Sequence, residues 1–279
     1  MRYLSFLFLC LVLSISCKQK KAETTETKEE PAMEVVQKPA TMAGETGTWT
    51  SLFNGKDLTG WNMKIVGHKL GENFGNTFRV EDGILSIRYD AYEDNFDNRF
   101  GALYYDKKLS NYRLKVEYRF VGETCLGAPE WGYRDSGVQY HCQPPETVGL
   151  NQSFPVSLEY NLHGGNGTDE RPVGEICAGG TLVEVNGAKN TSYCTPATVK
   201  RTFHGDQWVT MEIEIKDGTI SHYVNGEKIL TYTNPTYDPN HEIGKTFIVD
   251  GNDQVKDGYI SLQSNSHPID FRSIELLEY

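Results

Sequence analysis

From Trp49 onward, apolar and polar residues alternate along short segments that are separated by Gly, Asn and Asp. Alternation with a period of two is typical of β-strands that pack one face on a core. The Asn225-Gly226 pair predicts a two-residue hairpin turn between two such strands. The pattern therefore predicts an all-β sandwich of antiparallel strands. Its clearest strands are residues 114–120 (LKVEYRF), 136–141 (SGVQYH), 157–163 (SLEYNLH), 208–216 (WVTMEIEIK), 259–263 (YISLQ) and 271–279 (FRSIELLEY).

Two of these strands carry a chemically varied set of polar residues on the face that points away from the core. Glu117 and Arg119 alternate with apolar residues in the first strand, and Glu159, Asn161 and His163 do so in the second. We expect these five side chains to gather in one sugar-sized polar hollow. In the plainer alternative, Glu117 and Arg119 form structural ion pairs with neighbouring strands, and His163 simply ends its strand.

The N-terminal segment has the layout of an export signal. Residues 1–16 (MRYLSFLFLCLVLSIS) place one early positive charge before a short apolar run, too short to span a bilayer. Cleavage after Ser16 would leave Cys17 first, which resembles a lipoprotein signal and predicts lipidation of Cys17; an ordinary cleaved signal is the alternative. Residues 17–47 are polar and lack aromatic residues until the domain begins, so they predict a flexible tether to a domain at 48–279. The expected product is an exported lipoprotein of a Gram-negative-type envelope, periplasmic or at the cell surface, that meets the membrane only through its anchor.

Composition narrows the range of partners. The 279 residues include 38 acidic and 27 basic residues, for a net charge of −11. Nucleic-acid binding needs basic patches that neutralise phosphates, so a nucleic-acid partner is not expected. Sixteen Tyr and twelve Phe residues supply ample material for a core.

Four cysteines lie beyond the signal and anchor, namely Cys125, Cys142, Cys177 and Cys194. An even number in an exported chain predicts two disulfides. Of the three pairings, we favour the local closures Cys125–Cys142 and Cys177–Cys194. Zinc is the competing explanation, but the chain has no CxxC pair.

Several familiar catalytic and metal-binding motifs are absent from the sequence. It has no HExxH, no G-x-S-x-G elbow, no phosphate loop and no E-x-D-x-x-E pattern of the ordinary glycosidases of such sandwiches. Carboxylate and amide oxygens suit calcium, magnesium or manganese, so a divalent cation is left open without a firm cofactor prediction.

The segment SLFNGKDLTGW (51–61) closely resembles the start of the DUF1080, or 3-keto-disaccharide hydrolase, family. RLKVEYRF, DSGVQYH, SLEYNL, HYVNGEKI and GYISLQSNSHPIDFRSIEL resemble later blocks of the family in the expected order. The sequence departs from the family pattern at Asp135, Asn161, Tyr223 and Ser273. The resemblance implies a concanavalin A-like jelly roll, with two antiparallel sheets of which one carries the site.

The resemblance also implies cleavage of 3-keto-glycosides, by elimination or net hydrolysis. A ketone at carbon 3 acidifies the carbon-2 proton, so such a site needs a base, an oxyanion stabiliser and an acid. The sequence offers Glu159 or His163 as base, Arg119 or a divalent cation at the oxyanion, and Glu117 as acid or cation ligand. The expected substrate contacts come from Asn161, Gln139, His141, Trp131, Ser136 and Gln263. The alternatives are a non-catalytic carbohydrate-binding lipoprotein of the same fold and, third, an ordinary glycoside hydrolase.

Overall fold

The structure, a computed structural model of the chain, describes residues 47–93 and 95–279. The predicted signal at 1–16, the lipidation of Cys17 and all but the last residue of the predicted tether lie outside the described residues. Within the described ranges, no helix combines the length and the apolar character that a membrane crossing requires.

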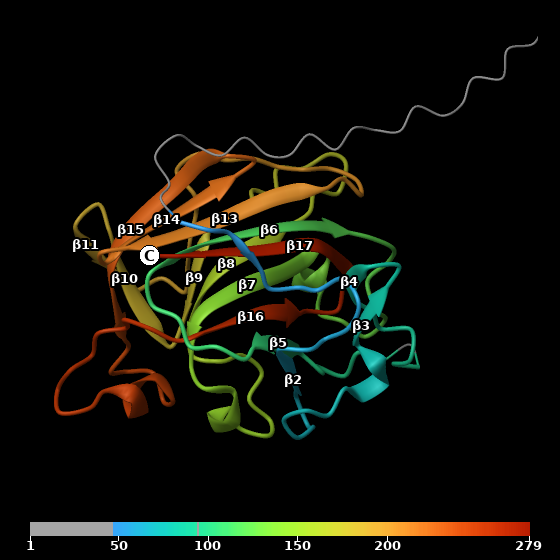
Figure 1. Cartoon of the computed structure of the whole chain (residues 1–279), viewed down its shortest axis with the longest axis horizontal. Helices are drawn as coiled ribbons and strands as arrows, with labels where there is room; N and C mark the ends of the chain where they lie inside the picture. The colour runs from blue at the N-terminus through green and yellow to red at the C-terminus, as the bar shows by residue number, and fades with distance from the viewer. Residues whose placement is uncertain (1–46, 94) are drawn as a thin grey trace, which may run out of the picture. The chain divides into compact units, whose positions relative to one another are not determined.

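The domain is a jelly-roll sandwich of two antiparallel sheets, as the alternating pattern predicts (Figure 1). The ten-stranded sheet runs in the order β11 (Ala188–Asn190), β10 (Thr181–Val185), β15 (Glu227–Tyr237), β14 (Thr219–Val224), β13 (Val209–Lys216), β6 (Tyr112–Phe120), β17 (Ile269–Glu278), β4 (Ile84–Ile87) and β3 (Phe78–Glu81), with β1 (Thr50–Ser51) paired to β17. The seven-stranded sheet runs in the order β12 (Cys194–Thr195), β9 (Ile176–Gly179), β8 (Ser157–His163), β7 (Asp135–Cys142), β16 (Tyr259–Ser264), β5 (Gly101–Tyr105) and β2 (Trp61–Ile65). In the described residues, the helical elements are four short 3₁₀ turns, η1 (Phe74–Asn76), η2 (Glu130–Gly132), η3 (Pro145–Thr147) and η4 (Gly244–Phe247).

The core between the sheets is built from the apolar half of each alternating strand. Leu158, Tyr160 and Leu162 of β8 are fully buried in it, opposite residues such as Ile213 of β13. The polar half of β8 therefore lies on the outer face of the seven-stranded sheet, because side chains alternate along a strand. Asn225 and Gly226 form the β14–β15 turn with φ of 47° and 81°, the left-handed values that this hairpin turn requires.

The two predicted disulfides have different outcomes. Cys177 of β9 and Cys194 of β12 are joined, as predicted. Cys125 and Cys142 are not joined to each other, so that pairing is wrong. The amide of Cys125 donates to the carbonyl of Ser266, which lies just beyond the last residue of β16. Cys142 is instead paired with Tyr259, the first residue of β16. The two cysteines thus lie near opposite ends of a strand about 20 Å long, too far apart for a disulfide.

Candidate functional site

Polar side chains form a continuous cluster on the outer face of the seven-stranded sheet, across β16, β7 and β8. The strand register places Ser261 beside Gln139 and Gln139 beside Glu159. One step along, Gly137 lies beside Asn161, and at the end of the strands Asp135 lies beside His163. This outer-face cluster consists of Asp135, Gln139, Glu159, Asn161, His163, Ser261, Gln263 and Asn265.

Glu159 is held at the centre of the cluster by two amide donors. Gln139 Nε2 and Gln263 Nε2 donate to its Oε2 atom over 3.0 and 3.1 Å. The other carboxylate oxygen, Oε1, receives no hydrogen bond from the described residues and lies over Gly137, close to where a Cβ there would be. The two glutamines thus fix the carboxylate while one of its oxygens stays available to a ligand.

Burial, reinforced by the neighbouring carboxylate of Asp135, raises the pKa of Glu159 to about 8. Hydrogen bonding from Gln139 and the proximity of His163 act in the opposite direction without cancelling this shift. A carboxyl group with a pKa near neutrality is suited to exchange protons with a substrate, because both its protonated and its ionised forms are populated at physiological pH.

Gly137 leaves the space that the Glu159 side chain occupies. A Cβ at this position would lie 2.5 Å from Glu159 Cδ and 2.6 Å from Oε1. We expect Gly137→Ala to displace the carboxylate, because a flexible side chain yields more readily than the sheet, and to lower kcat/KM on the 3-keto-glycoside that the family resemblance implies by about 10²-fold. Steady-state kinetics and thermal unfolding measure the two effects.

Gly149→Ala is the control for this substitution, because its Cβ would meet only Gln152 at an ordinary 3.6 Å. We expect it to leave both kinetics and unfolding unchanged. Full turnover by Gly137→Ala would contradict the assigned position of Glu159.

His163 and Asp135 form an ion pair at the end of the cluster. His163 Nε2 lies 3.0 Å from Asp135 Oδ2, and its Nδ1 lies 3.0 Å from the carbonyl oxygen of Pro172. Burial lowers the pKa of His163, but the hydrogen bond and charge of Asp135, together with Glu175, outweigh it and raise that pKa above its ordinary value. His163 therefore tends to carry a positive charge that faces a cluster of carboxylates, and its side chain keeps 21% exposure.

The disulfide and Tyr193 border the cluster on the β9 side. Cys177 is paired with Glu159 across the strands. The Glu175 carboxylate accepts a 3.0 Å hydrogen bond from the side chain of Asn161. The same carboxylate has an oxygen within 4.8 Å of the sulfur atoms of Cys177 and Cys194. The carbonyl of Tyr193 accepts a 2.7 Å hydrogen bond from the amide of Ala178, and the residue as a whole is 57% exposed. Burial of the hydroxyl and the nearby carboxylates of Glu159 and Asp135 raise the pKa of Tyr193. The phenol is therefore a protonated group within electrostatic range of both acids.

Trp131 lies in η2, just before β7, and is 50% exposed. One face of its indole is stacked on Phe100, with ring centroids 5.5 Å apart and an interplanar angle of 11°. The stacking fixes the ring and leaves area exposed for a ligand, as a sugar-stacking platform requires.

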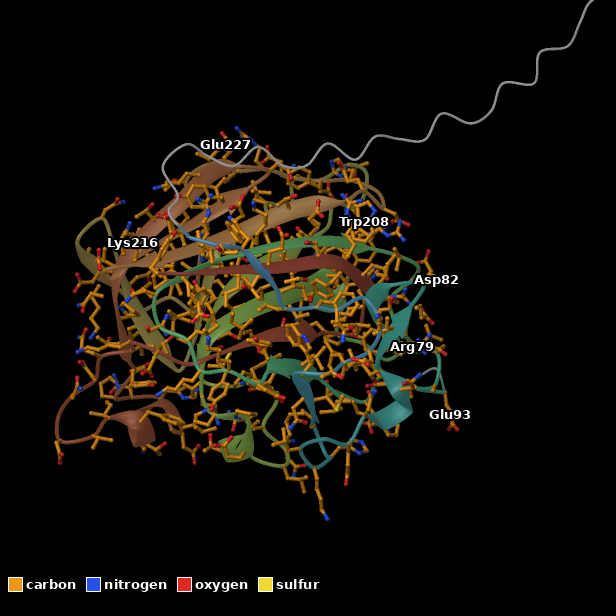
Figure 2. All side chains as sticks on the ribbon, in the orientation of Figure 1. Arg79, Asp82, Glu93, Trp208, Lys216 and Glu227 are labelled. Carbon is orange, nitrogen blue, oxygen red and sulfur yellow. A yellow bond between two sulfur atoms is a disulfide. The ribbon has the colours of Figure 1, made fainter. Side chains whose placement is uncertain are left out.

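Glu117 and Arg119 are not part of this cluster, so the expected five-residue hollow is wrong. Both residues lie on β6 in the ten-stranded sheet, whereas Glu159 lies in the other sheet. Glu117 accepts two hydrogen bonds from Arg272, and Arg119 donates to Asp270 over 3.0 Å. The guanidinium groups of Arg119 and Arg272 each lie 4.6 Å from the centre of the Trp208 ring, and Trp208 is half-buried (Figure 2).

Two further expected contacts are also wrong. Ser136 is completely buried on the core side of β7, where its hydroxyl donates to the carbonyl of Gln263. His141 has a φ of 47°, and the β7–β16 register shifts beside it. This β-bulge reverses the alternation, so the His141 ring packs toward Tyr112 and Tyr140 on the core side.

Five residues in or around the cluster were not among the predicted site residues. Asp135, Ser261 and Asn265 continue the alternation of Gln139 and Gln263, so the period of two alone was enough to find them. Glu175 and Tyr193 lie outside the alternating segments and come near Glu159 only through long-range pairing of β9 and β12.

A divalent cation would have to use the acids and histidine of the cluster. In the described part of the chain, the group with metal-like spacing is Glu175, Cys177 and Cys194, but the disulfide removes both thiolates. The carboxylates of Asp135, Glu159 and Glu175 and the imidazole of His163 do not bring three ligand atoms within 4.8 Å of one another, so these described residues form no group with metal-like spacing.

Comparison with known proteins agrees with the fold. A Bacillus subtilis protein of unknown function with a galectin-like fold is similar with a TM-score of 0.51 and 10% identity, over 83% of this chain and 94% of that chain. A Parabacteroides distasonis protein provisionally named a glycosyl hydrolase has a TM-score of 0.49 and 20% identity, over 84% of this chain and 94% of that chain. No curated protein matches the chain.

The family match identifies this jelly roll as a carbohydrate-related domain. Residues 48–277 match the family described as the 3-keto-alpha-glucoside-1,2-lyase-like domain. The chain belongs to this family, as its sequence blocks predict.

Proposed function

We propose that this protein cleaves 3-keto-glycosides by removing the proton from carbon 2 and eliminating the group on carbon 1, with water then adding in a net hydrolysis. The observation that carries the proposal is the carboxylate of Glu159, which is buried and oriented by two amides, and whose Oε1 atom accepts no hydrogen bond from the described residues. The family match supports the same substrate class.

Glu159 is the proposed base. Its pKa of about 8 makes it a much stronger proton acceptor than an ordinary carboxylate, while a useful fraction stays ionised near neutral pH. The oxygen free of protein hydrogen bonds accepts the carbon-2 proton, and the electron pair left on carbon 2 is delocalised onto the carbon-3 carbonyl oxygen. Breaking the carbon-1 to oxygen bond then releases the leaving group.

We assign the two roles that Arg119 and Glu117 were expected to fill to two other residues. The positive charge of His163, held by Asp135, is the proposed stabiliser of the developing oxyanion. The protonated hydroxyl of Tyr193, near both Glu159 and Asp135, is the proposed donor to the leaving oxygen.

The test incubates the purified protein with one disaccharide in its unmodified form and in its 3-keto form. We expect bond cleavage of the keto form alone. Chromatography of the released sugars measures the cleavage. Binding without cleavage would favour a carbohydrate-binding role, and cleavage of the unmodified sugar would favour an ordinary glycosidase. Repeating the assay after treatment with a chelator, and again after adding back calcium, magnesium or manganese, determines whether the reaction needs a cation.

A further inference from the structure

A chain of side-chain amides joins two acids of the outer-face cluster, Asp135 and Glu159. Asn265 Nδ2 donates to Asp135 Oδ1 over 2.7 Å and also to Gln263 Oε1. Gln263 Nε2 in turn donates to Glu159 Oε2 over 3.1 Å. All four of these residues are buried. Protein groups rather than solvent therefore decide which way each amide is turned.

Each link of this chain distinguishes the two ends of an amide. The C=O and NH2 groups of a side-chain amide differ little in size, so their hydrogen-bond partners decide which group points at a neighbour. The Asp135 carboxylate, ion-paired with His163, offers only acceptor atoms, and Asn265 must turn its NH2 group toward it. The same NH2 group binds the carbonyl oxygen of Gln263. Gln263 is thereby left with its own NH2 group facing Glu159.

The second amide that binds Glu159 is oriented less strictly. Gln139 Nε2 donates to the same Oε2 atom over 3.0 Å, and Gln139 Oε1 accepts from the hydroxyl of Ser261 over 2.9 Å. A hydroxyl group can donate or accept, so Ser261 is compatible with either orientation of Gln139. The NH2 group of Asn265 only donates. The Asn265 branch is therefore the one that enforces a direction.

The backbone beside Asn265 is held in a strained conformation. Ser266 has a φ of 89°, in the left-handed region that non-glycine residues rarely adopt. Its amide donates to the hydroxyl of Tyr89, and its carbonyl accepts from the amide of Cys125, each over 2.9 Å. Gly132 packs closely on this segment, since a Cβ there would lie 3.0 Å from the carbonyl oxygen of Asn265. Strain that neighbouring contacts maintain in this way is characteristic of functional positions.

We propose that Asn265 is a positioning residue that, through Gln263, keeps an N–H donor on Glu159 Oε2 and so makes Oε1 the oxygen that takes up and releases the proton. An oxygen that already accepts two N–H groups is badly placed to receive a proton, because the proton would face those donors. Oε1 accepts no hydrogen bond from the residues that the structure describes. The orientation itself requires no reaction, whereas its effect on turnover rests on the proposed function.

Loss of the Asn265 amide should raise the pKa of Glu159. Hydrogen bonds to an ionised carboxylate favour that form, so a lost or reversed donor favours the protonated one. The other titratable groups near Glu159 keep their identity in an Asn265 variant; they are Asp135, Cys142, His163, Glu175 and Tyr193. We expect Asn265→Leu, which keeps the branched shape without donors, to raise the pKa from about 8 to about 9 or higher.

The test titrates the purified protein without substrate and follows the side-chain carboxyl carbons by ¹³C NMR, with Glu159→Gln identifying the Glu159 signal. Asn265→Ala is the second variant and should raise the same pKa if Asn265→Leu does not fold. Asn73→Leu is the matched control. The Asn73 side chain makes two hydrogen bonds with the backbone of Phe78 in the other sheet, so its loss should lower Tm and leave the pKa of Glu159 unchanged.

Two further measurements separate a directed amide from a general loss of packing. Ser261→Ala should raise the pKa of Glu159 by less than half as much as Asn265→Leu. With the 3-keto substrate, the pH at which kcat/KM levels off should rise with the pKa in Asn265→Leu, whereas a purely structural defect would lower the plateau without moving it. An unchanged pKa in both Asn265 variants, or an equal rise in Ser261→Ala or Asn73→Leu, would overturn the proposal. A pKa shift in a protein that does not cleave the keto sugar would support the positioning role and reject the proposed function.

Discussion

Replacing Glu159 by Gln should abolish turnover of a 3-keto-glycoside and at the same time stabilise the protein at alkaline pH. The substitution keeps the shape of the side chain and an oxygen that accepts from Gln139 and Gln263, but removes the base. We expect kcat to fall by about 10²- to 10⁴-fold. In the native protein, kcat/KM should rise with pH and level off above a pH of about 8, where Glu159 is ionised.

The stability effect follows from the direction of the Glu159 pKa shift. Its pKa is raised from 4.5 to about 8, so the folded protein binds more protons than the unfolded chain between these values. The stabilising contribution of the protonated carboxyl is fully present below the lower value and is lost as pH rises through the upper one. Above pH 8 the ionised, buried carboxylate should cost on the order of several kcal/mol, a cost that Gln does not incur.

Chemical denaturation at several pH values measures this difference. The two proteins should have similar free energies of unfolding near pH 4, and Glu159→Gln should be the more stable at pH 8 to 9. Glu117→Gln, in the other sheet and paired with Arg272, provides the matched control and should keep full turnover. Activity that survives in Glu159→Gln but not in Glu117→Gln would reverse the assignment of the site.

The sequence predicts the strands well because alternation is a local property. Residues 157–163 form β8 with the predicted inward and outward faces, and residues 208–216 correspond closely to β13. Asn225 and Gly226 likewise encode their turn through backbone preferences of their own. Each of these features depends on residues close together in the chain.

The composition of the site depends on long-range pairing, which a single sequence does not encode locally. The polar faces of β6 and β8 look equally suited to a site, but β6 pairs with β13 and β17 whereas β8 pairs with β7 and β9. Glu117 and Glu159 therefore separate onto different sheets. One bulge was enough to move His141 to the core side, since a single extra residue reverses the alternation.

Breaking the Cys177–Cys194 disulfide should affect both the stability of the domain and the border of the candidate site. The bond closes a segment with a sequence separation of 17, for which the loss of cross-linking costs about 3 kcal/mol. In a domain of this size, that cost corresponds to a fall in Tm of roughly 6–12 °C. Differential scanning calorimetry of the Cys177→Ser/Cys194→Ser double variant measures the fall.

The same change should impair both substrate binding and the chemical step without changing the titration of Glu159. Tyr193 precedes Cys194 and is attached to β9 through the amide of Ala178, so loss of the bond frees the segment that places its phenol beside Glu159 and Asp135. The two glutamines that orient Glu159 belong to β7 and β16 and do not depend on the disulfide. We therefore expect KM to rise and kcat to fall, while the pH at which kcat/KM levels off stays the same. A reducing agent should convert the native protein to the behaviour of the double variant and leave the variant unaffected. A double variant with native Tm and native kinetics would show that neither the stability of the domain nor the position of Tyr193 depends on this bond.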